Sequence, residues 1–318
     1  MSSLAFFGCE DATGPSVETG IAEAKITLSI QGTKPASLAK GWSAWSVQSD
    51  SVVLPVTDAN GNPIGTLTID DARLALKEIK LKLAEEEIEG NADSLELEQE
   101  NDSIKFPGPY IVELIHNTVS PPLDTITIPA GIYKELELKL DKIEGDEDDE
   151  DGTQLVDSSD PLFGNSIYIA GTYTGLTAGG EVTGVPFILS YDFGEKFELT
   201  GLDTTTNAAD SAVGMTISDL VGVNPIIIAF RMVQWFSFSN PETNDKELDF
   251  SSLVVTEDAD GMPQILLDED AEDDNKEIRK VIKENIKESA DYGKDKDGDG
   301  ELDSDEDDDP DDEDDDDD

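Results

Sequence analysis

The sequence has very few of the residues from which most catalytic and metal sites are built. Its 318 residues include one cysteine and one histidine. These counts exclude an intrachain disulfide and a zinc cluster of the Cys/His type. They also remove the usual base for a serine or cysteine nucleophile. His116 follows an apolar run, and we interpret it as a partly exposed residue at a strand end.

Positive charge is also scarce. Lys and Arg number 21 against 74 Asp and Glu, which gives a formal net charge of -53 at pH 7. Such a chain repels nucleic acids and attracts cations, so we expect no nucleic-acid partner. The acidity is densest in Gly145–Gly152 and after Gly293, with a steady excess elsewhere. After the N-terminus, no stretch approaches the roughly 20 apolar residues of a membrane-spanning helix.

Alternating apolar and polar residues are the main structural signal. In Thr125–Asp141, two alternating runs flank the break Pro129–Gly131. Period-two alternation turns one set of side chains inward, so the segment predicts a half-buried antiparallel strand pair. The first part of Asp70–Leu83 is also compatible with a helix. We favour a strand with a bulge near Lys77–Glu78.

Similar runs separated by Gly, Pro and Asn turns predict an all-β fold. We expect an antiparallel β-sandwich over residues 24–270, with two smaller sandwiches in the same range as the alternative. The most apolar run, Pro225–Phe236, predicts a central strand buried on both faces, with Arg231 as its polar member. Further predicted strands are Ala24–Ile30, Ser51–Pro55, Thr66–Ile69, Ile104–Ile115, Ser166–Thr174, Val185–Phe193 and Glu195–Leu199.

The apolar period changes to four near the C-terminus. Ile278, Ile282 and Ile286 form one stripe of a helix predicted over Asp274–Ala290, and Gly293 predicts its end. We expect this helix to pack on the sandwich, with docking of a partner helix as the alternative. Residues 291–318 are predicted to be a disordered acidic tail that contains one calcium-loop-like segment.

The chain begins with a short apolar run that ends at Gly8-Cys9. This start resembles the end of a bacterial lipoprotein signal, in which a small residue precedes a cysteine that becomes acylated. It departs from that pattern because no Lys or Arg precedes the run and because the run is short. We expect lipidation at Cys9, with residues 1–23 as signal remnant and tether; an incidental cysteine in a disordered N-terminus is the alternative.

Asp295–Glu306 fits the twelve-residue calcium loop of an EF-hand position by position, with Gly300 at the sharp turn. A flanking helix on each side is not predicted, so the loop is more like the isolated calcium loops of secreted bacterial proteins. We expect a weak Ca²⁺ site, with diffuse cation binding by the acidic tail as the alternative. The predicted ligands are Asp295, Asp297, Asp299, Glu301, Asp303 and Glu306.

Three short segments resemble an uncharacterised family of bacterial and archaeal envelope lipoproteins. They are Ile26–Ile30, Ile128–Tyr133 with the alternating strand that follows, and Pro186–Tyr191. The resemblance covers roughly residues 24–236. It implies a transthyretin-like or immunoglobulin-like sandwich behind a lipidated cysteine, and it implies no activity.

We therefore expect a non-catalytic protein of the cell envelope, held at the membrane through Cys9 and facing the periplasm or the exterior. An alternative is a module that binds carbohydrate, peptide or an envelope protein through exposed Trp42, Trp45 and Trp235. A hydrolase with paired acids is a third hypothesis, but no carboxylate pair stands out among so many.

Overall fold

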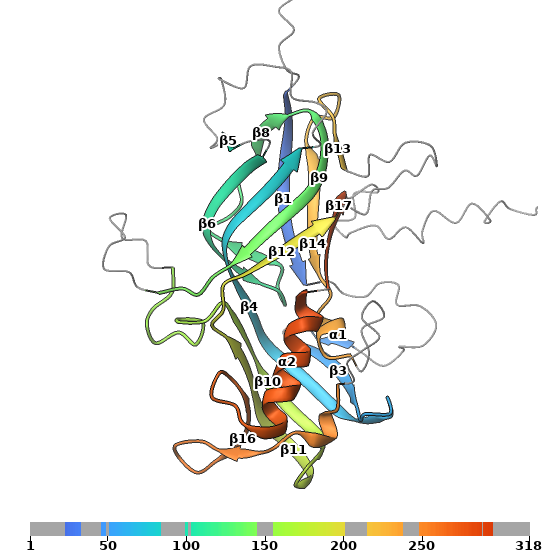
Figure 1. Cartoon of the computed structure of the whole chain (residues 1–318), viewed down its shortest axis with the longest axis vertical. Helices are drawn as coiled ribbons and strands as arrows, with labels where there is room; N and C mark the ends of the chain where they lie inside the picture. The colour runs from blue at the N-terminus through green and yellow to red at the C-terminus, as the bar shows by residue number, and fades with distance from the viewer. Residues whose placement is uncertain are drawn as a thin grey trace, which may run out of the picture.

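In the computed structural model, the described residues are 23–32, 46–48, 51–83, 99–100, 103–144, 155–200, 215–237, 248–287 and 289–294. They are mostly β-strand and form an elongated, sandwich-like arrangement of two sheets (Figure 1). The predictions for Cys9, Trp42, Trp45, Gly145–Gly152 and Asp295–Asp318 lie outside these residues.

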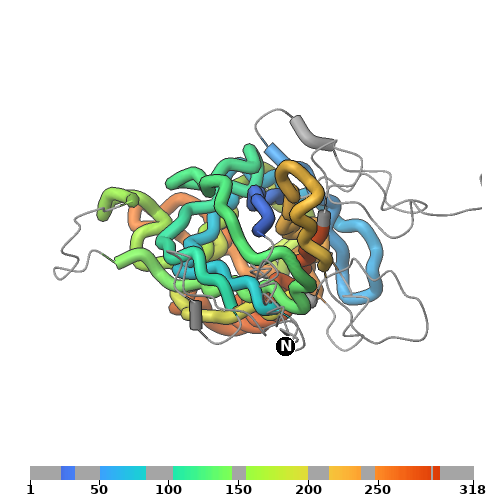
Figure 2. Tube along the Cα trace, turned by 90° about the horizontal axis from the view of Figure 1, so that it is seen from above, coloured from blue at the N-terminus to red at the C-terminus, as the bar shows by residue number. Residues whose placement is uncertain are grey.

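The smaller sheet has four strands. Alternation in its first strand buries Ile26, Leu28 and Ile30 against the core. Figure 2, viewed along the long axis, shows this strand beside the more apolar strand at residues 224–230. The strand order is β8 (Ile126–Pro129), β1 (Glu23–Gly32), β14 (Asn224–Phe230) and β17 (Ala290–Lys294).

The larger sheet has thirteen strands and extends beyond the smaller one. Its main path runs through β12 (Glu195–Thr200), β9 (Gly131–Leu140), β4 (Pro63–Leu83), β10 (Ile167–Thr177), β11 (Gly180–Tyr191), β16 (Pro263–Leu267) and β15 (Thr256–Glu257). The remaining strands are β2 (Ser46–Gln48), β3 (Ser51–Thr57), β5 (Gln99–Glu100), β6 (Ser103–Glu113), β7 (Thr118–Ser120) and β13 (Met215–Ile217).

β4 joins the two halves of the molecule. Its first part pairs with β3 and β10, and its second part pairs with β6 and β9. The register shifts between Leu76 and Glu78 against both β6 and β9, which confirms the predicted bulge. Before the bulge Leu74 and Leu76 are buried, and after it Ile79 and Leu81 are buried. One extra residue therefore changes which side chains face the core.

The half of the larger sheet that extends beyond the smaller one is covered by helices. These are α1 (Met232–Trp235), the 3₁₀ turn η1 (Phe250–Ser252) and α2 (Asp273–Lys287). Ile278, Ile282 and Ile286 of α2 are buried in the same apolar core as the strands, which confirms that the predicted stripe packs on the domain. Figure 1 shows α2 lying along this part of the sheet.

The two strands predicted within Thr125–Asp141 are present, but the prediction that they pair with each other is wrong. β8 pairs with β1 in the smaller sheet, whereas β9 pairs with β4 in the larger sheet. The chain therefore crosses between sheets at Ala130, and the hydroxyl of Tyr133 donates a 2.8 Å hydrogen bond to the carbonyl of Pro129 across this corner. A crossing lets apolar residues of β8 and β9 enter one core from opposite sides, which a hairpin in one sheet would not allow.

Two predicted boundaries near the C-terminus are also wrong. β14 ends at Phe230 rather than Phe236, and α1 follows it. α2 ends at Lys287, and Gly293 lies inside β17, which pairs with β14. Tertiary pairing with β14 overrides the helical period beyond Lys287, so Ala290 is buried as a strand residue.

The sheets are mixed rather than purely antiparallel. β14 pairs in parallel with β1, and β16 pairs in parallel with β11. Parallel neighbours require long connections, and these pairs join segments that are far apart in the sequence. Among the described residues, no helix is long and apolar enough to cross a membrane.

Candidate functional site

Trp235 is the one predicted contact residue that the structure describes, and it is fully buried. Its indole nitrogen donates to the hydroxyl of Ser289, and its ring meets Phe230 edge to face with centroids 6.3 Å apart. The side-chain amide of Asn285 donates to the Trp235 carbonyl over 3.2 Å. Trp235 therefore packs α1 against the end of α2, and its assignment as an exposed ligand contact is wrong.

The predicted calcium loop begins directly after a strand. β17 ends at Lys294, which is opposite Ile226 of β14 in the register. An EF-hand loop is entered from a helix, whereas here α2 ends at Lys287 and β17 intervenes. The predicted loop is therefore preceded by a strand rather than by a helix, and its predicted ligands lie outside the described residues.

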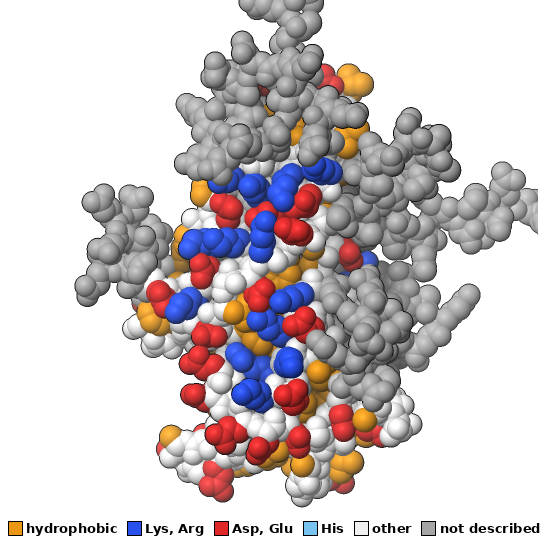
Figure 3. All heavy atoms as spheres, viewed as in Figure 1, with side chains coloured by type: hydrophobic (Ala, Val, Ile, Leu, Met, Phe, Trp, Pro, Cys, Tyr) orange, Lys and Arg blue, Asp and Glu red, His pale blue; other side chains and the backbone are white. Residues whose placement is uncertain are grey.

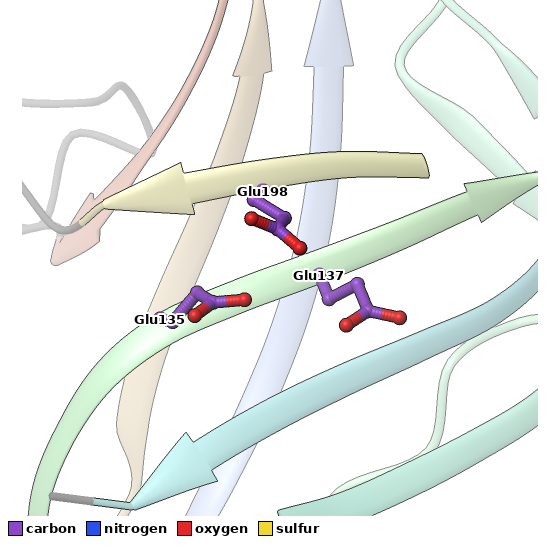
Figure 4. Close-up of side chains that lie close together, drawn as sticks. All are labelled: Glu135, Glu137 and Glu198. Carbon is purple, nitrogen blue, oxygen red and sulfur yellow. The ribbon is translucent and has the colours of Figure 1, made fainter. Parts of the chain in front are cut away.

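The strongest cluster of metal-ligand side chains in the described residues is a carboxylate triad. It consists of Glu135 and Glu137 on β9 and Glu198 on β12 (Figure 4). One carboxylate oxygen from each lies within 4.8 Å of the others. Glu137 is opposite Glu198 in the β9–β12 register, and Glu135 shares its face of β9 because the two are separated by one residue.

Two lysines neutralise much of this charge. Lys82 of β4 contacts Glu135 and lies 3.3 Å from Oε2 of Glu137. Lys196 of β12 lies 2.6 Å from the same Oε2 atom and 3.1 Å from Oε1 of Glu198. That Oε2 atom is buried, and the two ammonium groups supply the positive charge nearest to it.

The lysines determine the protonation of the central carboxyl. Burial alone would raise the pKa of Glu137, but the ammonium groups of Lys196 and Lys82 outweigh that effect and lower it. The pKa of Lys196 is raised mainly by Glu137. Burial would lower the pKa of Lys82, yet Glu135 and Glu137 raise it. All three groups are therefore held in their charged forms.

A metal ion at the triad would have to displace the lysines. Three carboxylates offer a donor set that suits Ca²⁺ or Mg²⁺. However, Lys82 and Lys196 already occupy the positions that approach Glu137 most closely, and with both charged the cluster retains one net negative charge. The arrangement is best explained as an ion-pair network that covers the outer face of the sandwich.

A separate set of ion pairs joins β12 to α2. Figure 3 shows Lys and Arg side chains gathered with Asp and Glu along this face. Glu195 of β12 lies 2.7 Å from Lys283 and 3.2 Å from Lys287 of α2. Burial would raise the pKa of Glu195, and the two lysines reverse this and lower it. Charge pairing thus joins α2 to the edge of the larger sheet.

The sequence predictions missed the triad. The available signal was the alternation Glu135-Leu-Glu137-Leu-Lys139, which places charged residues on the face of β9 opposite its leucines. Finding the cluster also required knowing that β4 and β12 flank β9, and neither neighbour is adjacent to β9 in the sequence.

Comparisons with known proteins provide no family. The sequence matches no protein-family model, and no curated protein is significantly similar to it. Among solved structures, the chain is similar to one described as MbnP from Methylosinus trichosporium, with 10% sequence identity and a TM-score of 0.29. The match covers 73% of this chain and 80% of that chain, and a likeness this weak carries no argument about function.

Replacing Glu137 by Gln should destabilise the protein at pH 7 by about 1–3 kcal/mol, because two ammonium groups lose their shared buried partner. Since the native pKa of Glu137 is lowered, its carboxylate stabilises the fold above the unfolded pKa, which is about 4.3. That stabilisation is lost as the pH falls through the native pKa. Urea unfolding of wild type and Glu137→Gln at neutral and acidic pH measures the difference.

The matched control is Glu198→Gln, because the Glu198 side chain is 58% exposed and shares only Lys196. Its effect should stay within about 0.5 kcal/mol. An equal effect of the two variants, or a Glu137→Gln effect that does not depend on pH, would contradict this account of the network.

Proposed function

We propose that the chain is a non-catalytic protein of the cell envelope, anchored to a membrane by acylation of Cys9. In this proposal the β-sandwich faces the periplasm or the exterior and has a structural or binding role. A second element of the proposal is a weak calcium site formed by Asp295–Glu306. The observation that carries the proposal is the lipoprotein-like run that ends in Gly8-Cys9.

The position of the first strand supports a tether. β1 begins at Glu23, fourteen residues after Cys9, and it enters the smaller sheet at one end of the molecule. A chain of fourteen residues spans at most about 50 Å. β4 has 21 residues and, at about 3.3 Å per residue, is longer than that span. An acyl group on Cys9 would therefore hold this end of the molecule close to the membrane.

The calcium proposal rests on the spacing of carboxylates and glycines in Asp295–Glu306. Entry from β17 rather than from a helix favours an isolated loop over a paired EF-hand. An unpaired loop should bind in the range of about 10⁻⁴–10⁻³ M that is typical of extracellular modules. The acidic residues that follow would raise the local concentration of cations.

The alternative of a Trp-based binding module has less support. Trp235 is buried, which leaves Trp42 and Trp45 as the candidate contact residues of such a module. No observation on the described residues favours a sugar or peptide contact over the anchored envelope protein.

If Cys9 carries the anchor, Cys9→Ser should move the protein from the membrane fraction to the soluble fraction of cells that process lipoproteins. Loss of two or three acyl chains removes the main source of membrane affinity. Mass spectrometry of the mature N-terminus should show the acyl groups on the wild type. Ser16→Ala, in the same segment, is the matched control and should remain in the membrane fraction, whereas an unchanged Cys9→Ser fraction would exclude the anchor.

If the loop binds calcium, calorimetric titration of the full chain with Ca²⁺ should show one saturable site. Asp297→Ala combined with Glu306→Ala should abolish it, because these residues are the third-position and bidentate twelfth-position ligands. Asp309→Ala with Asp311→Ala removes the same charge outside the loop and should leave the site intact. A linear response, or equal losses in the two double variants, would show binding by the polyanion alone.

A further inference from the structure

An apolar loop projects from the end of the molecule at which the first strand begins. It connects β13 to β14 and carries Leu220, Val221 and Val223. Leu220 is 91% exposed, the highest value among the large apolar residues that the structure describes as exposed, and Val221 and Val223 are 47% and 42% exposed. Apolar residues scattered singly on a surface are ordinary, whereas these three lie within four positions at one tip and form a local apolar patch.

The loop is held in this conformation by hydrogen bonds at its base. The side chain of Asn224, which is 2% exposed, accepts a 3.3 Å hydrogen bond from the Ser218 backbone N–H and donates one of 2.9 Å to the Ser218 carbonyl. The Ser218 hydroxyl accepts from the Leu220 backbone N–H over 3.2 Å. These bonds close the base of the loop, so its apolar side chains are directed outward by a defined structure.

The same asparagine connects the loop to the start of the chain's first strand. Its side-chain amide donates a 3.1 Å hydrogen bond to the carbonyl of Lys25, and Asn224 is opposite Ile26 in the parallel β1–β14 register. Lys25 is two residues after Glu23, where β1 begins. The apolar tip and the attachment point of the tether to Cys9 are therefore neighbours at one end of the molecule (Figure 1).

We propose that Leu220, Val221 and Val223 insert into the lipid surface to which the chain is tethered, and so orient the protein end-on. This inference rests on the proposed anchor at Cys9, which brings the same end of the molecule to the bilayer. Apolar side chains that enter the interface add affinity in proportion to the area they bury.

With a net charge of -53, broad contact with an anionic bilayer is repelled. Asp219 lies in the loop and Glu23 at the start of β1, and Lys25 is an exposed cation beside them. β17 ends at the same end of the molecule, where Lys294 is opposite Ile226 and the acidic segment from Asp295 begins. The affinity of this end for lipid would therefore come from the apolar side chains rather than from its charge.

Photo-cross-linking to lipid tests the insertion directly. Cys9 supplies the one thiol of the sequence, so the full chain can be coupled there to maleimide-phosphatidylethanolamine in phosphatidylcholine vesicles. This chemical tether is present whether or not cells acylate Cys9. Leu220 is replaced by p-benzoylphenylalanine in one variant and Met262 in another, and lipid adducts are counted by mass spectrometry after irradiation.

Met262 is a matched control because it is also apolar and 61% exposed, and because its turn between β15 and β16 lies at the opposite end of the molecule. Figure 1 shows β16 far from β13. We expect several-fold more lipid adduct at position 220 than at position 262. Leu220 makes no core contact, so circular dichroism should show an unchanged fold in the variant.

Equal adduct yields at the two positions would overturn the insertion. So would adducts between two protein chains at position 220, because they would show that a second copy covers the loop. Failure of the natural anchor would appear separately, as a Cys9→Ser variant that stays in the membrane fraction, and would not change the yields measured with the chemical tether.

Discussion

The hydrogen bonding of β4 is the interaction on which the rest of the structure depends. Four strands pair along its two edges: β3 and β10 beside its first part, β6 and β9 beside its second. β4 therefore contributes backbone pairing to both the sandwich half and the helix-covered half. The strand serves both halves because its register changes. Buried residues fall at Leu67 and Ile69, then at Leu74 and Leu76, and then at odd positions again from Ile79.

The bulge that makes the second change requires a close approach from β6. A Cβ atom on Gly108 would lie 2.5 Å from the Leu76 carbonyl oxygen and 2.8 Å from that of Lys77. Glycine is therefore needed where β6 passes the bulge. Lys77 itself points to solvent and pairs with Asp141 over 2.8 Å. A larger residue at position 108 would push β6 away from β4 and disturb the register of the sandwich half.

Residue patterns predicted the local structure well and the partners poorly. Alternation identified most strands, and the phase change at Lys77 identified the bulge, because these signals lie within one segment. The crossing at Ala130 was missed because alternation says which side chains face inward but not which sheet receives the strand. The Glu137 network was missed for the same reason, since Lys82 and Lys196 come from strands that only the fold brings beside β9. The helix end at Lys287 was missed because pairing of β17 with β14 is a long-range contact.

Native-state hydrogen exchange along β4 tests most directly whether this strand unites the two halves. If it does, the paired amides of Leu67 and Ile69 in the first part and of Ile79 and Leu81 in the second should exchange with one free energy, equal to that of global unfolding. They should also respond equally to added urea. Two distinct free energies, with one half opening while the other stays protected, would contradict the account and show two independent folding units that β4 merely connects.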